Sequence, residues 1–246
     1  IGTELAVILY FRHDIIRILG AWFGSLFGKE GKDFKSRMGA HNPDTQMGWF
    51  IILGTMPILI AGLLFKHAIE GSLRNLWITV TVLALFGVLL WVVDARSKQV
   101  KTMKEMTWKD ALIFGIGQML ALIPGVSRSG GTITFGRAMG YTREAAVRVS
   151  FLMAIPAVFG AGILEAVSAV KDVAAGDAGM FPGWGPTIAA AIVAFVVGYV
   201  VIIGFLKFVS TFSYKAFAIY RIGLAIVVAL LLITGVLSPL EAAAAA

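Results

Sequence analysis

Apolar residues along this chain fall into long runs that are separated by short polar segments. A helix needs about 20 consecutive, mostly apolar residues to cross the hydrocarbon core of a bilayer. The runs close to this length are Gly48–Phe65, Leu76–Val93, Val149–Val167, Ile188–Leu206 and Phe217–Val236. The pattern therefore predicts an all-α integral membrane protein, a helical bundle that crosses the membrane several times.

The two ends of the chain do not follow this pattern. The first apolar run, Ile1–Phe11, is too short to span a bilayer, and we interpret it as the second half of a helix. An amphipathic stretch follows, from Arg12 to about Gly28. Residues 240–246, Leu-Glu followed by five alanines, are interpreted as an appended tail that is foreign to the native protein. Residues 1–239 are predicted to form a single membrane domain.

The region at about 111–140 breaks the spanning pattern. Ala111–Ile123 is apolar but only 13 residues long, and it ends at Pro124-Gly125. A second short segment, Thr132–Met139, follows a run of glycines. Irregular backbone at membrane depth is tolerated only where protein or a water-filled cavity covers it. We therefore predict a re-entrant helical hairpin here, with a binding site at the break.

Composition agrees with a membrane protein, at 59% hydrophobic and 14% charged residues. Soluble domains have about 45–50% apolar and about 25% charged residues. The net charge of +7 is explained by basic loops at 29–47, 94–110 and 207–216, which the positive-inside rule places in the cytoplasm. No nucleic-acid partner is therefore expected. The absence of cysteine excludes disulfides, thiol nucleophiles and zinc–thiolate sites.

The break itself carries the strongest candidate chemistry. Arg128 lies in a segment otherwise apolar enough for a bilayer, where a charge costs about 2.5–3.5 kcal/mol on insertion scales. A turn rich in glycine can aim backbone N–H groups at a phosphate, and a guanidinium matches phosphate bidentately. The alternative is a helix-packing element, because small residues let membrane helices approach closely. That alternative explains the glycines but gives no reason for Arg128.

Other polar residues in apolar surroundings allow more than one interpretation. Gln118 either contributes to the site or makes an ordinary interhelical hydrogen bond. Arg221 is either a second phosphate clamp or a snorkelling arginine at the membrane interface. Arg143 is expected at the interface, whereas Arg137 and Arg148 are expected to pair with lipid or protein acids.

The sequence Pro-Gly-Val-Ser-Arg-Ser-Gly-Gly-Thr, residues 124–132, resembles the second signature of the undecaprenyl-pyrophosphate phosphatase family, also called bacitracin-resistance proteins. Gln118–Leu122, Ser150–Pro156 and Phe217–Arg221 also resemble that family. The similarity covers residues 1–236 in order. It implies an inverted-topology repeat with two re-entrant hairpins, of which the first part is missing from this sequence.

The resemblance implies an enzyme of the bacterial plasma membrane that removes one phosphate from a C55 isoprenoid pyrophosphate, recycling the lipid carrier of cell-wall synthesis. It assigns catalysis to Arg128, Ser127 and Ser129. It assigns substrate binding to Gly125, Gly130, Gly131, Thr132, Gln118 and Arg221. A divalent cation, magnesium or calcium, is the implied cofactor. The expected partners are the polyprenyl diphosphate and membrane lipids, and a homodimer is an open alternative to a monomer.

One part of the family pattern does not occur in this sequence. The first signature is a glutamate-rich segment followed by a Pro-Val-Ser-Ser-x-Gly-His type loop, and it would lie upstream of Ile1. The catalytic base and nucleophile are expected there. The chain as given supplies the half of the site that stabilises phosphoryl charge, and by itself we expect it to be inactive.

Three other functions compete with this interpretation. A polyprenyl-phosphate or other anionic-lipid transporter or flippase would also use broken helices and an anion site at mid-membrane. A lipid phosphatase of the PAP2 type needs a histidine after its Ser-Arg motif, and no histidine follows His67. A structural membrane subunit without a ligand leaves Arg128 unexplained.

Overall fold

The computed structural model describes residues 2–174 and 183–240. Of the predicted tail at 240–246, all residues after Leu240 lie outside the described residues. The described residues form helices and contain no strand, which confirms the all-α prediction. The chain divides into two compact units, each described by itself. Unit 1 comprises residues 1–49 and 151–208, and unit 2 comprises residues 50–150 and 209–246. The predicted single domain stays a prediction.

Five helices in the described part of the chain are long and apolar enough to cross a membrane, which confirms the five predicted spans. They are α4 (Pro43–Leu64), α6 (Leu76–Arg96), α9 (Arg143–Ala174), α10 (Trp184–Thr211) and α11 (Lys215–Ile233). Many of their large apolar side chains are exposed, as expected for helices that face lipid rather than water. Pro57 and Pro156 lie inside α4 and α9, in keeping with the tolerance of membrane helices for proline.

Unit 1 begins with α1 (Gly2–Tyr10), α2 (Arg12–Leu26) and α3 (Phe34–Arg37). The predicted amphipathic stretch is therefore helical, as α2. One face of α2 packs inside the unit, where the rings of Trp22 and Trp49 lie 5.4 Å apart. The Ser25 hydroxyl donates hydrogen bonds to the carbonyl oxygens of Ser36 and Arg37, at 3.1 and 2.9 Å. These bonds tie α2 to α3.

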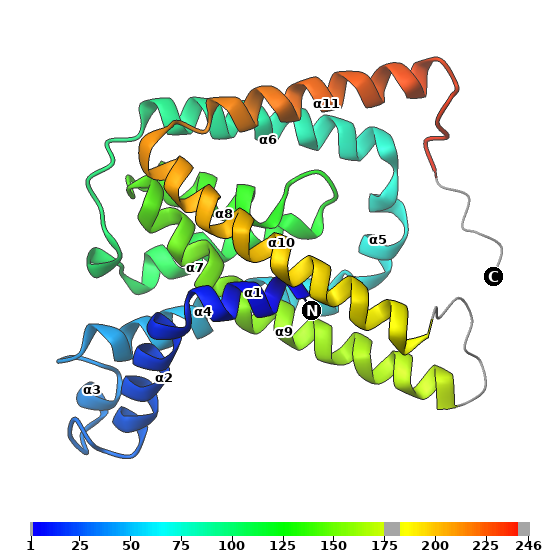
Figure 1. Ribbon diagram of the computed structural model, residues 1–246. Coiled ribbons are helices and arrows are strands. Elements are labelled where there is room, and N and C mark those ends of the chain that lie inside the picture. The colour runs from blue at the N-terminus through cyan, green and yellow to red at the C-terminus, as the bar shows by residue number, and fades with distance from the viewer. Residues whose placement is uncertain (1, 175–182, 241–246) are drawn as a thin grey trace. The chain divides into compact units, whose positions relative to one another are not determined.

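Unit 2 contains the predicted hairpin. Its first half is α7 (Trp108–Met119), which continues into the short helix η3 (Leu120–Leu122), and its second half is α8 (Arg128–Ala138). The two halves pack against each other, α8 packs against α6, and α6 lies alongside α11 (Figure 1). The connecting segments contain α5 (Lys66–Glu70), η1 (Ser72–Arg74) and η2 (Met103–Glu105). The prediction of two half-length helices around a break is confirmed.

The start of the hairpin is fixed by a buried carboxylate. Asp110 forms a capping box with Thr107, and its Oδ2 also accepts a hydrogen bond of 3.0 Å from the Tyr141 hydroxyl. Burial opposes ionisation of Asp110, but the hydrogen bonds from Thr107 and Tyr141 outweigh it and lower its pKa. Burial and the bond to Asp110 raise the pKa of Tyr141. Asp110 is therefore an anion and Tyr141 a neutral donor at physiological pH.

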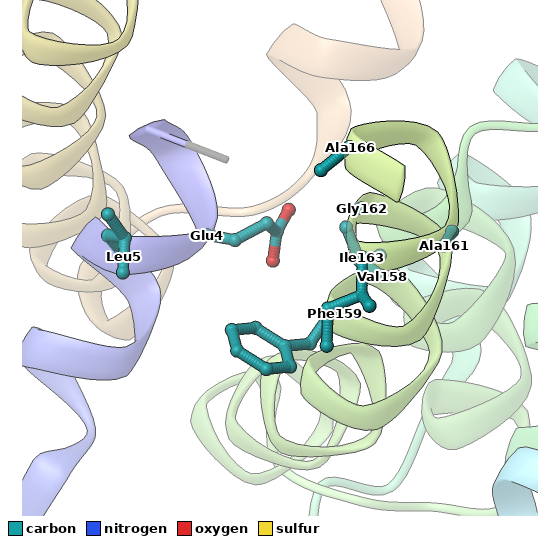
Figure 2. A pocket seen from close by; sticks show the side chains of 8 residues that line it. All are labelled: Glu4, Leu5, Val158, Phe159, Ala161, Gly162, Ile163 and Ala166. Carbon is teal, nitrogen blue, oxygen red and sulfur yellow. The ribbon is translucent and has the colours of Figure 1, made fainter. Parts of the chain in front are cut away.

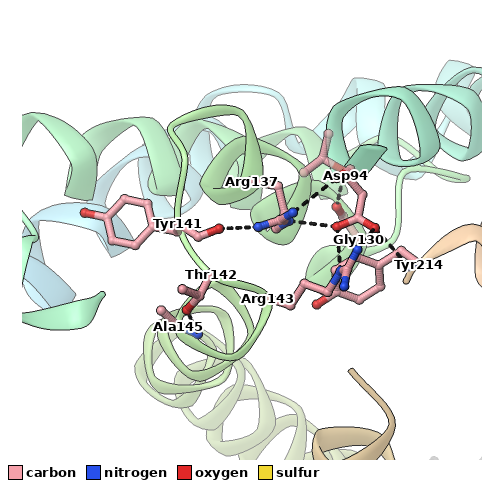
Figure 3. Close-up of polar contacts among 9 residues, drawn as sticks. Asp94, Gly130, Arg137, Tyr141, Thr142, Arg143, Ala145 and Tyr214 are labelled. Carbon is pink, nitrogen blue, oxygen red and sulfur yellow. Dashed lines mark hydrogen bonds and ion pairs between the residues drawn. The ribbon is translucent and has the colours of Figure 1, made fainter. Parts of the chain in front are cut away.

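A second buried carboxylate joins four segments of unit 2. Asp94, in the last turn of α6, accepts hydrogen bonds from Arg137 Nε at 2.8 Å and from Arg143 Nε at 2.9 Å. It also accepts one of 3.1 Å from the backbone N–H of Tyr214 (Figure 3). Arg137 in addition donates to the Tyr141 carbonyl oxygen. We call Asp94, Arg137, Arg143 and Tyr214 the Asp94 cluster; it links α6, α8, α9 and the start of α11.

We predict that Tyr141→Phe lowers the stability of the protein in a pH-dependent way. A hydrogen bond to a charged group contributes about 1.5–3 kcal/mol. Because the native pKa of Asp110 is lowered, this stabilisation is complete above the unfolded-state value, about 3.9, and is lost as pH falls through the native pKa. Thermal unfolding in detergent should show a large difference from wild type at pH 7 that shrinks in acid. A difference that stays constant with pH would contradict the assigned role of Asp110.

Candidate active site

The tip of the hairpin is a five-residue loop, Ile123–Ser127, which leads from η3 into α8. Within it, the N–H of Val126 donates to the carbonyl oxygen of Ile123 at 3.2 Å. Gly125 has a φ of +99°, and a Cβ added to it would lie 2.5 Å from the carbonyl oxygen of Thr79 in α6. Glycine is therefore required by both the turn and the close approach of α6.

Ser127 is the N-cap of α8. Its Oγ accepts a hydrogen bond of 3.3 Å from the N–H of Gly130, and its side chain is exposed. Its φ of 68° and ψ of 124° are unfavourable for a residue with a Cβ. Strain of this kind costs about 1–3 kcal/mol and tends to occur at functional sites. The strained residue is the one from which α8 begins.

The first turn of α8 holds Arg128, Ser129 and Gly130, all partly buried. The first N–H groups of a helix have no partner within the helix and carry partial positive charge, so this end attracts anions. Phosphate binding at a helix N-terminus is a common use of that geometry. Arg128 adds a full positive charge to the same turn.

Arg221, in α11, brings a second guanidinium to the tip. Its Nη2 donates to the Gly125 carbonyl oxygen at 2.5 Å, and its residue is only 9% exposed. A Cβ added to Gly130 would lie 2.8 Å from Arg221 Nη1. This position favours the phosphate clamp over the snorkelling alternative, because the guanidinium is buried against the tip. It leaves Arg221 beside the N-terminus of α8.

Two predicted phosphate-binding residues are used by the hairpin itself. A Cβ added to Gly131 would lie 2.5 Å from the Gly117 carbonyl oxygen in α7, so this glycine lets the two halves approach. Thr132 is fully buried, and its hydroxyl donates to the Arg128 carbonyl oxygen at 2.8 Å. In this conformation its one O–H donor is engaged inside α8. Helix packing thus explains Gly131. It gives no reason for Arg128 and Ser127, which remain candidate site residues.

Gln118, near the end of α7, is fully buried. Within the described residues, neither its amide nitrogen nor its amide oxygen has a hydrogen-bond partner. An ordinary interhelical hydrogen bond is therefore not formed. A buried group without a partner costs about 1–3 kcal/mol and calls for an explanation such as a ligand or an ordered water. This favours the site interpretation of Gln118.

Unit 1 contains a cavity of different character. It has a volume of about 310 Å³ and lies between α1 and α9. Leu5, Phe159 and Ile163 are among its apolar lining residues, and the acidic side chain of Glu4 also lines it (Figure 2). A carboxylate repels phosphate, so this cavity suits hydrocarbon rather than a diphosphate.

The implied divalent cation finds no complete site in the described part of the chain. No three histidine, aspartate or glutamate side chains there lie close enough together to hold a metal ion. Magnesium and calcium need several oxygen ligands, and the hairpin tip offers arginine, serine and glycine instead. The described residues do not fit this cofactor by themselves, so no step is derived through it.

Comparison with known proteins decides the family. The family described as bacitracin resistance protein BacA matches residues 1–227 of this chain. The chain belongs to this family. The resemblance that residues 124–132 suggested is thereby confirmed for nearly the whole chain.

Several curated relatives of the family are named undecaprenyl-diphosphatase. The protein of Bifidobacterium adolescentis is 92% identical over all 246 residues, which cover 84% of that protein. The protein of Bifidobacterium longum subsp. infantis is 70% identical over 246 residues, all of this chain and 83% of that protein. The protein of Pseudarthrobacter chlorophenolicus is 51% identical over 239 residues, 97% of this chain and 82% of that protein.

Sequence reasoning missed Asp94. The structure places both Arg137 and Arg143 on the Asp94 carboxylate, and the expectation that Arg143 lies at the membrane interface stays a prediction. The expectation that Arg137 pairs with an acid is confirmed. A signal was present in the sequence, because Asp94 is an acid directly after a long uncharged run, two residues before Arg96. Such acids are functional candidates by default.

Gly131→Ala should destabilise the hairpin, because the atom nearest to the new Cβ, at 2.5 Å, is the backbone carbonyl oxygen of Gly117 in α7. Overpacking of this kind costs about 1–3 kcal/mol. The matched control is Gly62→Ala in α4, where a Cβ meets nothing within 4 Å. The control should be neutral or stabilising by up to about 1 kcal/mol. Equal melting temperatures for the two variants would contradict the close packing of α7 and α8.

Gln118→Leu should raise the melting temperature of the ligand-free protein while it lowers activity. Leucine has a similar volume and removes a buried amide that costs about 1–3 kcal/mol. Thermal unfolding without ligand and phosphate release measure the two effects separately. A lower melting temperature with unchanged activity would identify Gln118 as an ordinary structural residue.

Proposed function

We propose that this chain functions as an undecaprenyl-diphosphatase, which hydrolyses undecaprenyl pyrophosphate to undecaprenyl phosphate and inorganic phosphate. Membership of the bacitracin-resistance family and the names of its relatives support this activity. Five helices that can span a membrane support a substrate that resides in lipid. We place the enzyme in the bacterial plasma membrane, where it would return the lipid carrier to cell-wall synthesis.

The observation that carries the proposal is the pairing of a helix N-terminus with two arginines. Arg128 begins α8, and Arg221 reaches the same end of that helix from α11. A diphosphate carries negative charge on several oxygens, and positioning together with charge neutralisation accounts for most of phosphoryl-transfer catalysis. We assign Arg128 to the transferred phosphate, with Ser127 and Ser129 as further donors and Arg221 as a second clamp.

The reaction transfers the terminal phosphoryl group to water. The water oxygen forms a bond to the terminal phosphorus, and the bond from that phosphorus to the bridging oxygen breaks. The bridging oxygen stays with the lipid as part of undecaprenyl phosphate. Arg128 and the N–H groups of α8 stabilise the charge that spreads over the terminal oxygens. The base that accepts the proton of water is assigned to the family's first signature, which this sequence does not contain.

Arg128→Ala should lower kcat for phosphate release by at least about 100-fold, because removal of one group that stabilises charge in the transition state costs about that much. Arg128→Lys should recover only part of the activity, since a lysine cannot bind phosphate bidentately. The assay is phosphate release from undecaprenyl pyrophosphate in detergent. Each variant is tested in the full open reading frame that encodes this chain, because we expect the chain by itself to be inactive.

Arg74→Ala is the matched control, because Arg74 is an exposed arginine in η1 and outside the site. It should retain wild-type turnover. Retained phosphate release in Arg128→Ala would remove Arg128 from the mechanism. If the wild-type full-length protein binds the lipid but releases no phosphate, the site serves transport of an anionic lipid instead.

A further inference from the structure

The Asp94 cluster and the hairpin tip lie at opposite ends of α8, and both contact the N-terminal part of α11. Arg137 is nine residues after Arg128 in α8, and Tyr214 is seven residues before Arg221, next to α11. At 1.5 Å per residue, these separations amount to about 13 and about 10 Å along the helix axes. Asp94 therefore binds the C-terminal end of α8 and the start of α11, the two helices that present the two arginines to the substrate.

We propose that Asp94 is a positioning residue of the phosphate site, which holds α8 and α11 in the register that brings Arg221 to the N-terminus of α8. The proposal rests on the proposed function. Asp94 does not touch the tip, so it acts through the arginines that the two helices carry. Neither the family resemblance nor the sequence motif assigns a role to this residue.

The contacts of Asp94 are suited to this role. Its side chain is 3% exposed, and that of Arg137 is fully buried. Arg143 binds both carboxylate oxygens, with Nε at 2.9 Å from Oδ1 and Nη2 at 3.0 Å from Oδ2. Oδ2 also accepts the N–H of Tyr214, the residue that precedes α11. A planar guanidinium bound at two points fixes direction as well as distance.

A second contact joins α8 and α11 at the hairpin tip. Arg221 donates to Gly125, which lies three residues before the first residue of α8. Both ends of α8 are thus tied to the N-terminal part of α11, one end by Asp94 and the other by the Arg221–Gly125 bond. Loss of either tie allows α11 to move relative to the tip. A displacement of 1 Å at a reacting group can lower the rate by about 100-fold.

Charge explains why an aspartate is required. Two guanidinium groups share this single carboxylate, and Arg137 has no exposed surface through which water could replace it. Asp94→Asn keeps the shape and one acceptor oxygen but loses the charge and the bidentate contact with Arg143. The substitution should therefore loosen the C-terminal end of α8 and the start of α11 without a change in side-chain volume.

The test is a double-mutant cycle with Asp94→Asn and Arg221→Gln, measured as phosphate release by the full-length enzyme. We expect Asp94→Asn to raise KM about tenfold in the wild-type background but less than about threefold when Arg221 is already absent. Glu144→Gln is the control, since Glu144 is 55% exposed in its ion pair with Arg148. It should leave KM unchanged in both backgrounds.

If Asp94 only stabilises the fold, Asp94→Asn lowers the melting temperature and the yield but leaves the KM of the folded enzyme unchanged. A second contrary result is a change in KM that is equally large with and without Arg221, so that the two substitutions are additive. Either result overturns the proposal. If Asp94→Asn is not recovered folded, Asp94→Glu replaces it, because it keeps the charge and shifts the carboxylate by one methylene. Retained phosphate release by Arg128→Ala would instead refute the proposed function, so the two failures are distinguishable.

Discussion

The carboxylate of Asp94 is the interaction on which unit 2 depends. It lies at the end of a span and binds two arginines and a backbone N–H from segments far apart in the sequence. A buried charge is stable only when it is paired and its remaining hydrogen-bonding capacity is satisfied. Asp94 meets this condition only when α6, α8, α9 and the start of α11 are all in place, so it selects one arrangement of these segments.

The hairpin tip shows a different situation, in which strain and positive charge are concentrated at the start of one helix. The strained Ser127 ends the loop, α8 begins at Arg128, and Arg221 reaches the tip from another span. Gln118 is buried without a hydrogen-bond partner among the described residues. A folded protein tolerates such groups where function needs them, and satisfied clusters elsewhere in the structure provide the compensating stability.

The glycines of the motif divide between packing and chemistry. Gly131 allows α7 and α8 to approach, and Gly125 forms the turn against α6. Gly130 leaves room for the guanidinium of Arg221. These three glycines lie within seven positions of one another. The sequence alone cannot separate their roles, because each role depends on a partner that lies elsewhere in the chain.

The sequence by itself determined the five spans, the broken hairpin and Arg128 as the residue to explain, because apolar run length, helix-breaking residues and a charge in an apolar segment are local properties. The motif also identified the family. Only the tertiary structure decided that Arg221 lies at the tip, that Thr132 bonds inside its own helix and that Asp94 holds two arginines. These facts depend on contacts between residues as many as 120 positions apart, and such contacts follow from how helices pack rather than from any local pattern.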